Sequence, residues 1–179
     1  STAKKFYKSQ NDERIILENK TNFIIEGNRK KIINKAIAMK KDLLIFDDGL
    51  QDKYVDYDLK FVCFDSKKWI GNGRLLPAGP LRENLKSLKK YDGVFLKNGN
   101  KNQNQLIDLI KSINPMIEIF ITNYKPNNLN QFDLNQNFLI FSGIGNPESF
   151  KELLRNNNFK IIKEIIFPDH YEYKKKDIE

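Results

Sequence analysis

Two adjacent carboxylates, Asp47 and Asp48, follow a short apolar run and precede Gly49. The run at 43–47 has the composition of a buried strand, and carboxylates at the end of such a strand face the ligand edge of a parallel sheet. At that edge an Asp can hold Mg²⁺ during phosphoryl transfer. Adjacent strand residues point to opposite faces, so only one of the two aims at the metal unless the strand has ended. A strand followed by an ordinary Asp-Gly turn is the alternative.

A loop at 71–83 brings Gly, Pro and Arg together. It holds three Gly, two Pro and two of the five Arg in the chain, Arg74 and Arg82. Gly allows a backbone to approach a ligand closely, and the Arg guanidinium pairs well with phosphate. The composition favours anion binding, with a rigid loop carrying surface Arg as the alternative.

Three weaker motifs also carry polar residues. The turn at 142–147 resembles half of a phosphate-binding fingerprint, although tight-turn chemistry explains a lone Gly-x-Gly more simply. His170, the only histidine, follows Asp169 in a turn after an apolar run, and Asp169 can fix its tautomer. A structural histidine is the alternative there. Asp12 and Glu13, taken alone, are typical of a solvated helix N-terminus.

Short apolar runs alternate with amphipathic stretches along the whole chain. This alternation predicts an α/β fold with a mainly parallel, helix-covered sheet. Ligands bind such sheets at the carboxyl ends of the strands, so functional residues should follow the apolar runs. We expect strands at 22–25, 43–47, 60–65, 93–97, 117–122, 138–142 and 161–167, and helices at 29–40, 80–89, 102–113 and 147–156.

A stretch rich in Asn and Gln around Pro126 indicates a turn and linker. We therefore assign 1–113 to a first core domain, 114–136 to a hairpin or linker, and 137–179 to a second α/β domain.

The chain has a net charge of +8, and 31 residues are Lys or Arg. Such a balance suits an anionic partner. Only five of the 31 are Arg, whereas readers of nucleic acid favour Arg, and no basic-aromatic recognition motif is present. We therefore expect no nucleic acid as a partner. Cys63 lies in an apolar run and is interpreted as a small core residue, and a lone cysteine builds no disulfide framework.

Taken in order, these motifs resemble those of the tetraacyldisaccharide 4'-kinase family of lipid A biosynthesis. The family pattern has Asp-Asp-Gly-x-Gln at a strand end, found here at 47–51. It continues with Gly-Asn-x-x-Leu-Leu-Pro-Ala-Gly-Pro-Leu-Arg-Glu, found at 71–83. A Ser-Gly-Ile-Gly-Asn-Pro turn at 142–147 and the Asp-His pair at 169–170 follow in the same order. The match runs from about Asn11 to the end, and the long loop string is highly specific.

This resemblance implies a P-loop NTPase-like parallel sheet with helices on both faces and a smaller second α/β domain. It implies a kinase that uses ATP and Mg²⁺ to phosphorylate the 4'-hydroxyl of a tetraacyldisaccharide 1-phosphate lipid A precursor. The expected place is the cytoplasmic face of the bacterial inner membrane, where the enzyme meets an anionic membrane surface. Oligomeric state is left open. No Gly-x-x-x-x-Gly-Lys-Ser/Thr sequence occurs in the 179 residues, so we expect a fragment that is inactive by itself.

The resemblance also implies roles for individual residues. Asp12 becomes the catalytic base and His170 its partner, while Glu13 and Asp47 become Mg²⁺ ligands. Candidate contacts to the cofactor are Asp48, Gln51, Arg29, Arg74 and Arg82.

Three positions depart from the family pattern. Asn11 stands where the family has Gly, and Asp52 stands where a His follows Asp-Asp-Gly-x-Gln. Tyr171 replaces the second His of Asp-His-His. These departures concern local details more than the overall reaction.

One alternative of another class is a non-catalytic nucleotide- or lipid-binding α/β module without a P-loop. Upstream coding sequence discriminates, because a Gly-rich loop ending in Lys-Ser/Thr would support the kinase. A nucleic-acid-binding domain is the last-ranked alternative, and it would bind with steep salt dependence.

Overall fold

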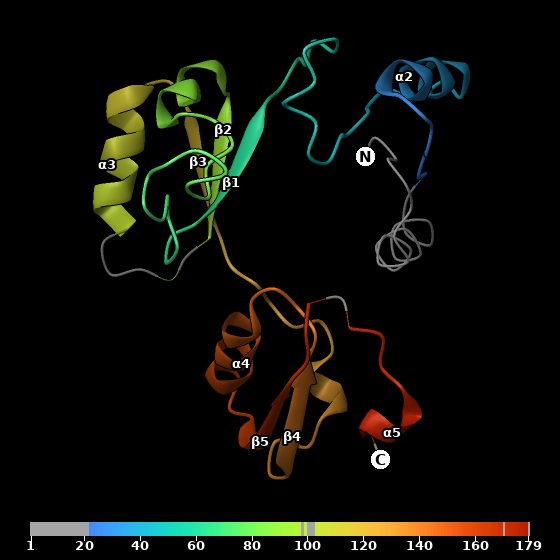
Figure 1. The fold of residues 1–179 in the computed structure, drawn as a ribbon, viewed down its shortest axis with the longest axis vertical. Helices are drawn as coiled ribbons and strands as arrows, with labels where there is room; N and C mark the ends of the chain where they lie inside the picture. Colours follow the sequence, from blue (N-terminus) through green and yellow to red (C-terminus); the bar gives the residue numbers. More distant parts are fainter. Residues whose placement is uncertain (1–21, 98, 100–102, 170, 179) are drawn as a thin grey trace. The chain divides into compact units, whose positions relative to one another are not determined.

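The computed structural model describes residues 22–97, 99, 103–169 and 171–178. The chain divides into two compact units, Ser1–Asn123 and Tyr124–Glu179 (Figure 1). Each unit contains its own parallel sheet. The expected α/β class is therefore confirmed, with parallel strands in two small sheets.

The sheet of the first unit contains β1 (Phe61–Asp65), β2 (Gly93–Lys97) and β3 (Glu118–Thr122) in that order, all parallel. Two helical elements connect these strands, the 3-10 helix η1 (Leu85–Lys90) and the α-helix α3 (Gln103–Ile113). Both lie beside the sheet in Figure 1. Parallel strands need such crossover connections, and helices provide them most readily.

The core of the first unit lies between this sheet and the two helical elements. Val94 and Leu96 alternate with outward residues along β2 and are fully buried, as is Ile110 of α3. Val94 and Leu96 are two residues apart on the strand, so they point to the same face of the sheet, and Ile110 packs with them from α3. The cluster is completed by Leu88 and Ile117, with Trp69 and other partly buried residues around it.

The other face of the same sheet carries aromatic rings. Phe95 and Phe120 are register partners and stack with ring centroids 5.1 Å apart. Phe61 lies 5.4 Å from Phe95, and its ring occupies the space beside Gly93, where a Cβ would approach it within 2.6 Å. Cys63 also lies on this face and is exposed. Its interpretation as a core residue is therefore wrong, because the core is on the opposite face.

The first helix, α2 (Arg29–Ala38), precedes this sheet. The Asn28 side chain accepts a hydrogen bond from the Lys31 backbone N–H and so caps the first turn. Lys40 then adopts a left-handed conformation, with φ of 51°, which ends the helix before the predicted residue 40.

The second unit has a smaller sheet of two parallel strands, β4 (Asn137–Ser142) and β5 (Lys160–Ile166). The helix α4 (Pro147–Asn156) connects them, and Pro147 occupies its first turn, where the missing N–H is tolerated. Lys151 of α4 pairs with Glu164 of β5. The short elements η2 (Leu129–Gln131) and α5 (Lys175–Ile178) flank this β-α-β unit.

Two predicted strands are absent from the described structure. Segments 22–25 and 43–47 have strand-like sequences, but neither forms part of a ladder there. A strand forms only when a neighbour completes its backbone hydrogen bonds. Without such a neighbour, Leu43 and Ile45 are 74% and 81% exposed.

The helix predicted at 80–89 is shorter, since η1 begins at Leu85 after an Asn84 cap. The backbone of Leu81 is held by Arg74 and Leu76 instead, which keeps this part of the chain out of a helix. The predicted segment 114–136 includes β3, which pairs with β2 and not with β4. The division at 113 and 136 stays a prediction.

We expect Ile110→Ala to destabilise the first unit by about 2–5 kcal/mol, because it leaves a cavity in a fully buried position. Leu109→Ala, the neighbouring change at a residue that is 40% exposed, should lower stability much less. Urea unfolding followed by fluorescence of Trp69, the only tryptophan, measures both. Equal losses in the two variants would contradict this core assignment.

Candidate functional site

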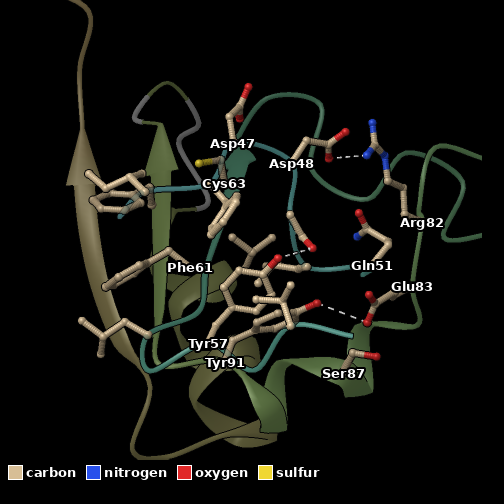
Figure 2. A pocket seen from close by; sticks show the side chains of 18 of the residues that line it. Asp47, Asp48, Gln51, Tyr57, Phe61, Cys63, Arg82, Glu83, Ser87 and Tyr91 are labelled. Atoms are coloured by element: carbon tan, nitrogen blue, oxygen red, sulfur yellow. Dashed lines mark hydrogen bonds and ion pairs between the residues drawn. The ribbon is translucent and has the colours of Figure 1, made fainter. Parts of the chain in front are cut away.

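A cavity of about 1140 Å³ opens in the first unit, next to β1. It is lined by α2, by the segment between α2 and β1, by β1 and by the chain that leads into η1. Most of its walls are apolar. The polar side chains of Asp47, Asp48, Gln51 and Arg82 gather along one side of it (Figure 2).

Asp48 is turned toward Arg82 at this edge, and the two side chains form an ion pair. The hydrogen bond from Arg82 holds the pKa of Asp48 below its usual value, and the same bond raises the pKa of Arg82. Asp48 has a φ of 52°, in the left-handed region that Asp tolerates better than most residues. The chain therefore turns sharply at the second carboxylate, so the two Asp residues are not consecutive residues of a strand.

Asp47 has a different environment from its neighbour. Its side chain is exposed and makes no hydrogen bond or ion pair with the described residues. A free carboxylate oxygen is the donor that Mg²⁺ prefers. Among the described residues, no three His, Cys, Asp or Glu side chains gather into a metal site. Glu13, the other expected ligand, lies outside the described residues.

Arg29 lies at the start of α2 and is buried, with a side chain that is 9% exposed. Its Nη1 donates to Asp52 Oδ2 at 2.9 Å and its Nη2 donates to the Asp48 carbonyl at 3.0 Å. The hydrogen bond from Arg29 lowers the pKa of Asp52. The guanidinium also lies 6.0 Å from the centre of the Phe46 ring. Arg29 thus joins α2 to both ends of the Asp48–Asp52 turn.

The loop at 71–83 is folded upon itself. Asn72 donates from Nδ2 to the Ala78 carbonyl and accepts the Arg74 backbone N–H at Oδ1. A Cβ at Gly79 would collide with Asn72 Oδ1 and the Arg74 carbonyl, so this position requires glycine. The Arg74 guanidinium is exposed and makes no hydrogen bond or ion pair with the described residues. The loop thus presents one Arg to solvent and directs the other, Arg82, to Asp48.

Glu83 follows Arg82 and accepts a hydrogen bond from Tyr91 Oη at 3.1 Å. Burial, reinforced by the Glu83 charge, raises the pKa of Tyr91 to about 12. The pair anchors the end of the loop against the start of β2, so the position of Arg82 is set from both sides.

Two further motifs meet in the second unit. A Cβ at Gly145 would lie 3.3 Å from Asp169 Oδ2, and one at Gly143 would lie 3.1 Å from the Pro168 carbonyl. The glycine turn after β4 and the segment after β5 therefore lie side by side, as expected for carboxyl ends of parallel strands. Asp12 and His170 lie outside the described residues.

The structure brings Arg29, Asp48 and Arg82 into direct contact, with Asp47 and Gln51 on the same pocket. It also adds site residues that were not predicted from the sequence. Their side chains form hydrogen bonds that hold the two loops beside the pocket. The missed residues are Asp52, Tyr57, Glu83 and Tyr91. Two of them gave a signal in the sequence: Glu83 ends the family string at 71–83, and Asp52 departs from the family pattern. The roles predicted for the site residues stay predictions.

The two parallel sheets and the helices that connect their strands define an α/β protein. A sequence model of the family described as Tetraacyldisaccharide-1-P 4'-kinase matches residues 3–179. A tetraacyldisaccharide 4'-kinase from Pelagibacter ubique (strain HTCC1062) is 47% identical over 178 residues, which are 98% of this chain and 56% of that protein. Its counterparts from Rickettsia bellii and Rickettsia akari are 38% identical over 169 residues, 94% of this chain and about half of each protein.

The chain belongs to the tetraacyldisaccharide 4'-kinase family. The resemblance inferred from its motifs is thereby confirmed. The chain spans about half the length of the curated relatives it matches. No solved structure matches it.

We expect Gly79→Ala to open the loop at 71–83, because the new methyl group displaces Asn72 or the Arg74 carbonyl. The rate of tryptic cleavage after Arg74 should rise several-fold. Gly27→Ala is the matched control, since a Cβ there meets nothing within 4 Å. Mass spectrometry of timed digests measures the rate, and an unchanged rate in Gly79→Ala would contradict the assigned loop packing.

Proposed function

We propose that this chain serves the transfer of phosphate from ATP to the 4'-hydroxyl of a tetraacyldisaccharide 1-phosphate lipid A precursor. One observation carries the proposal: Asp47, a carboxylate with no ion pair among the described residues, stands beside the Asp48–Arg82 pair on a chain that matches the kinase family from residue 3 to 179. Phosphoryl transfer requires positioning and charge compensation more than covalent chemistry from the protein. Carboxylates and Arg side chains at one pocket edge are suited to both tasks.

The described donor set fits Mg²⁺ in part. Asp47 has no ion pair with the described residues, and Mg²⁺ in kinases is held by one or two carboxylates together with phosphate oxygens and water. Asp47, with Glu13, would hold the ion, which offsets phosphate charge when bound. Asp48 is paired with Arg82, so we assign it to positioning of that guanidinium.

Arg74, Arg82 and Gln51 are the proposed contacts to phosphate groups. The Arg74 guanidinium is exposed and unbonded within the described part of the chain, and that of Arg82 is half exposed despite its pair with Asp48. Guanidinium groups bind phosphate through paired N–H donors. Asp12 would accept the proton of the acceptor hydroxyl, with His170 as its partner, as a positioned base does in phosphoryl transfer.

An anionic bilayer at the cytoplasmic face of the inner membrane is the proposed working surface. The net charge of +8 suits such a surface. No helix in the described part of the chain is long and apolar enough to cross a membrane. Contact with the bilayer is therefore proposed from charge and from the lipid nature of the substrate.

The test is transfer of labelled phosphate from Mg-ATP to the disaccharide lipid precursor, using the complete enzyme that contains this chain. Asp12→Ala should lower kcat by about 10²–10⁴-fold, the usual contribution of general base catalysis. The KM for ATP should change little, because the base contacts the acceptor. Asp108→Ala is the matched control, an exposed carboxylate on α3 without a hydrogen bond or ion pair to the described residues.

The outcomes separate the candidate functions. Label in the lipid that is lost only in Asp12→Ala supports the kinase and the base. Equal labelling by the wild-type enzyme and Asp12→Ala supports the kinase but means that another residue is the base. An enzyme that binds ATP or the lipid precursor but transfers no label would support the non-catalytic binding module.

A further inference from the structure

Asp52 has no role in the proposed reaction, yet it is the centre of a local network. Its Oδ2 accepts from Arg29 at 2.9 Å, and its Oδ1 accepts from the Tyr54 backbone N–H at 3.0 Å. Its own backbone N–H donates to the Gly49 carbonyl at 3.0 Å. Every one of these contacts involves the loop that contains the Asp47–Asp48 turn or the helix beside it.

The same carbonyl of Gly49 also accepts a hydrogen bond from Tyr57 Oη at 2.9 Å. The Tyr57 ring lies edge-on against Phe46, with centroids 5.7 Å apart. The Arg29 and Tyr57 side chains and the Asp52 backbone N–H therefore hold the carbonyls of Asp48 and Gly49. The loop has no sheet ladder of its own among the described residues, so these contacts determine its shape.

Two N–H donors of the Arg29 guanidinium are bonded to the Asp48–Asp52 turn. Each terminal nitrogen donates one hydrogen bond, and the side chain is 9% exposed. Nε is buried without a hydrogen-bond partner among the described residues. A phosphate group could reach this guanidinium only after the pair with Asp52 had opened. Breaking this partly buried pair leaves the buried Arg29 guanidinium without its counter-charge, which is unfavourable. Arg29 is therefore better suited to hold the protein than to hold a nucleotide.

We propose that Arg29 and Asp52 form a positioning clamp that fixes the Asp47–Asp48 turn for the reaction. The clamp acts through the Asp48 carbonyl, which receives Arg29 Nη2, and through the left-handed conformation of Asp48. This inference rests on the proposed kinase function. It gives a role to Asp52, an acidic residue at the position where the family pattern has His. An Asp can neutralise Arg29 at this place, whereas a His cannot.

The clamp makes a prediction that differs from direct nucleotide contact. In the complete enzyme, Asp52→Asn and Arg29→Gln should each lower kcat by about 10- to 100-fold, the loss that a misplacement of about 1 Å can cause. The KM for ATP should stay within about 2-fold, because neither residue contacts ATP. The double variant should be no worse than either single variant, since both remove one shared interaction.

Conservative and matched changes sharpen the test. Arg29→Lys keeps the charge but cannot reach Asp52 and the Asp48 carbonyl together, so kcat should fall about as much as in Arg29→Gln. Asp52→His introduces the residue of the family pattern, and its kcat should fall about as much as that of Asp52→Asn. Glu26→Gln is the matched control, because it removes an exposed pair between Lys35 of the same helix and a preceding carboxylate. It should leave kcat unchanged.

Amide hydrogen exchange provides a readout that does not depend on activity. In Asp52→Asn the segment 48–57 should exchange faster, while α3 keeps its protection. Several results would overturn the clamp: a higher KM for ATP in Arg29→Gln at normal kcat, additive losses in the double variant, or unchanged exchange at 48–57. Loss of protection throughout the first unit would mean a general stability role and would overturn it too. An inactive wild-type enzyme would instead refute the proposed function, and exchange at 48–57 would still decide whether the clamp holds the turn.

Discussion

The buried guanidinium of Arg29 is the interaction on which the candidate site depends. The segment between α2 and β1 runs from residue 39 to 60 with no strand or helix in it, so its main chain has no ladder to fix it. Arg29 supplies two donors from one rigid fork, and a fork can hold two acceptors at a defined spacing. Because Arg29 stands in the first turn of α2, the Asn28 cap that starts this helix also sets where the fork lies. The cap at the start of α2 therefore helps to determine the geometry of the Asp47–Asp48 turn.

The candidate site also depends on the parallel sheet of the first unit, which positions Arg82. It places the end of β1 at Asp65, from which the chain leaves for the loop that carries Arg82. Lys97 pairs with Asp65 at the end of the neighbouring strand, so both strand ends are held in register. Arg82 then returns to meet Asp48, which is held independently by α2. The site edge is thus defined where two separately anchored loops meet, and its precision depends on both anchors.

The sequence predicted the elements that carry a strong local signal and missed those that depend on partners. The apolar runs that became β1 to β5 are each paired with a neighbour, and their alternation was enough to identify them. The run at 43–47 has the same kind of sequence and forms no strand, because strand formation requires a partner that composition cannot reveal. The Asp48–Arg82 contact joins two motifs that sequence reasoning had selected separately. The Arg29–Asp52 contact was invisible, since nothing in either local sequence shows that the two residues approach.

Two adjacent carboxylates repel each other unless nearby cations compensate their charge. Here Arg82 pairs with Asp48, and Arg29 pairs with Asp52, so two of the three acidic side chains within 47–52 are neutralised locally. Asp47 is left without an ion pair among the described residues, although it lies near enough to Arg82 to raise the pKa of that guanidinium further. A carboxylate that is held in place by its backbone but not occupied by a protein partner is suited to receive a cation. The ion pairs around Asp47 therefore do more than stabilise the loop, because they decide which carboxylate stays available.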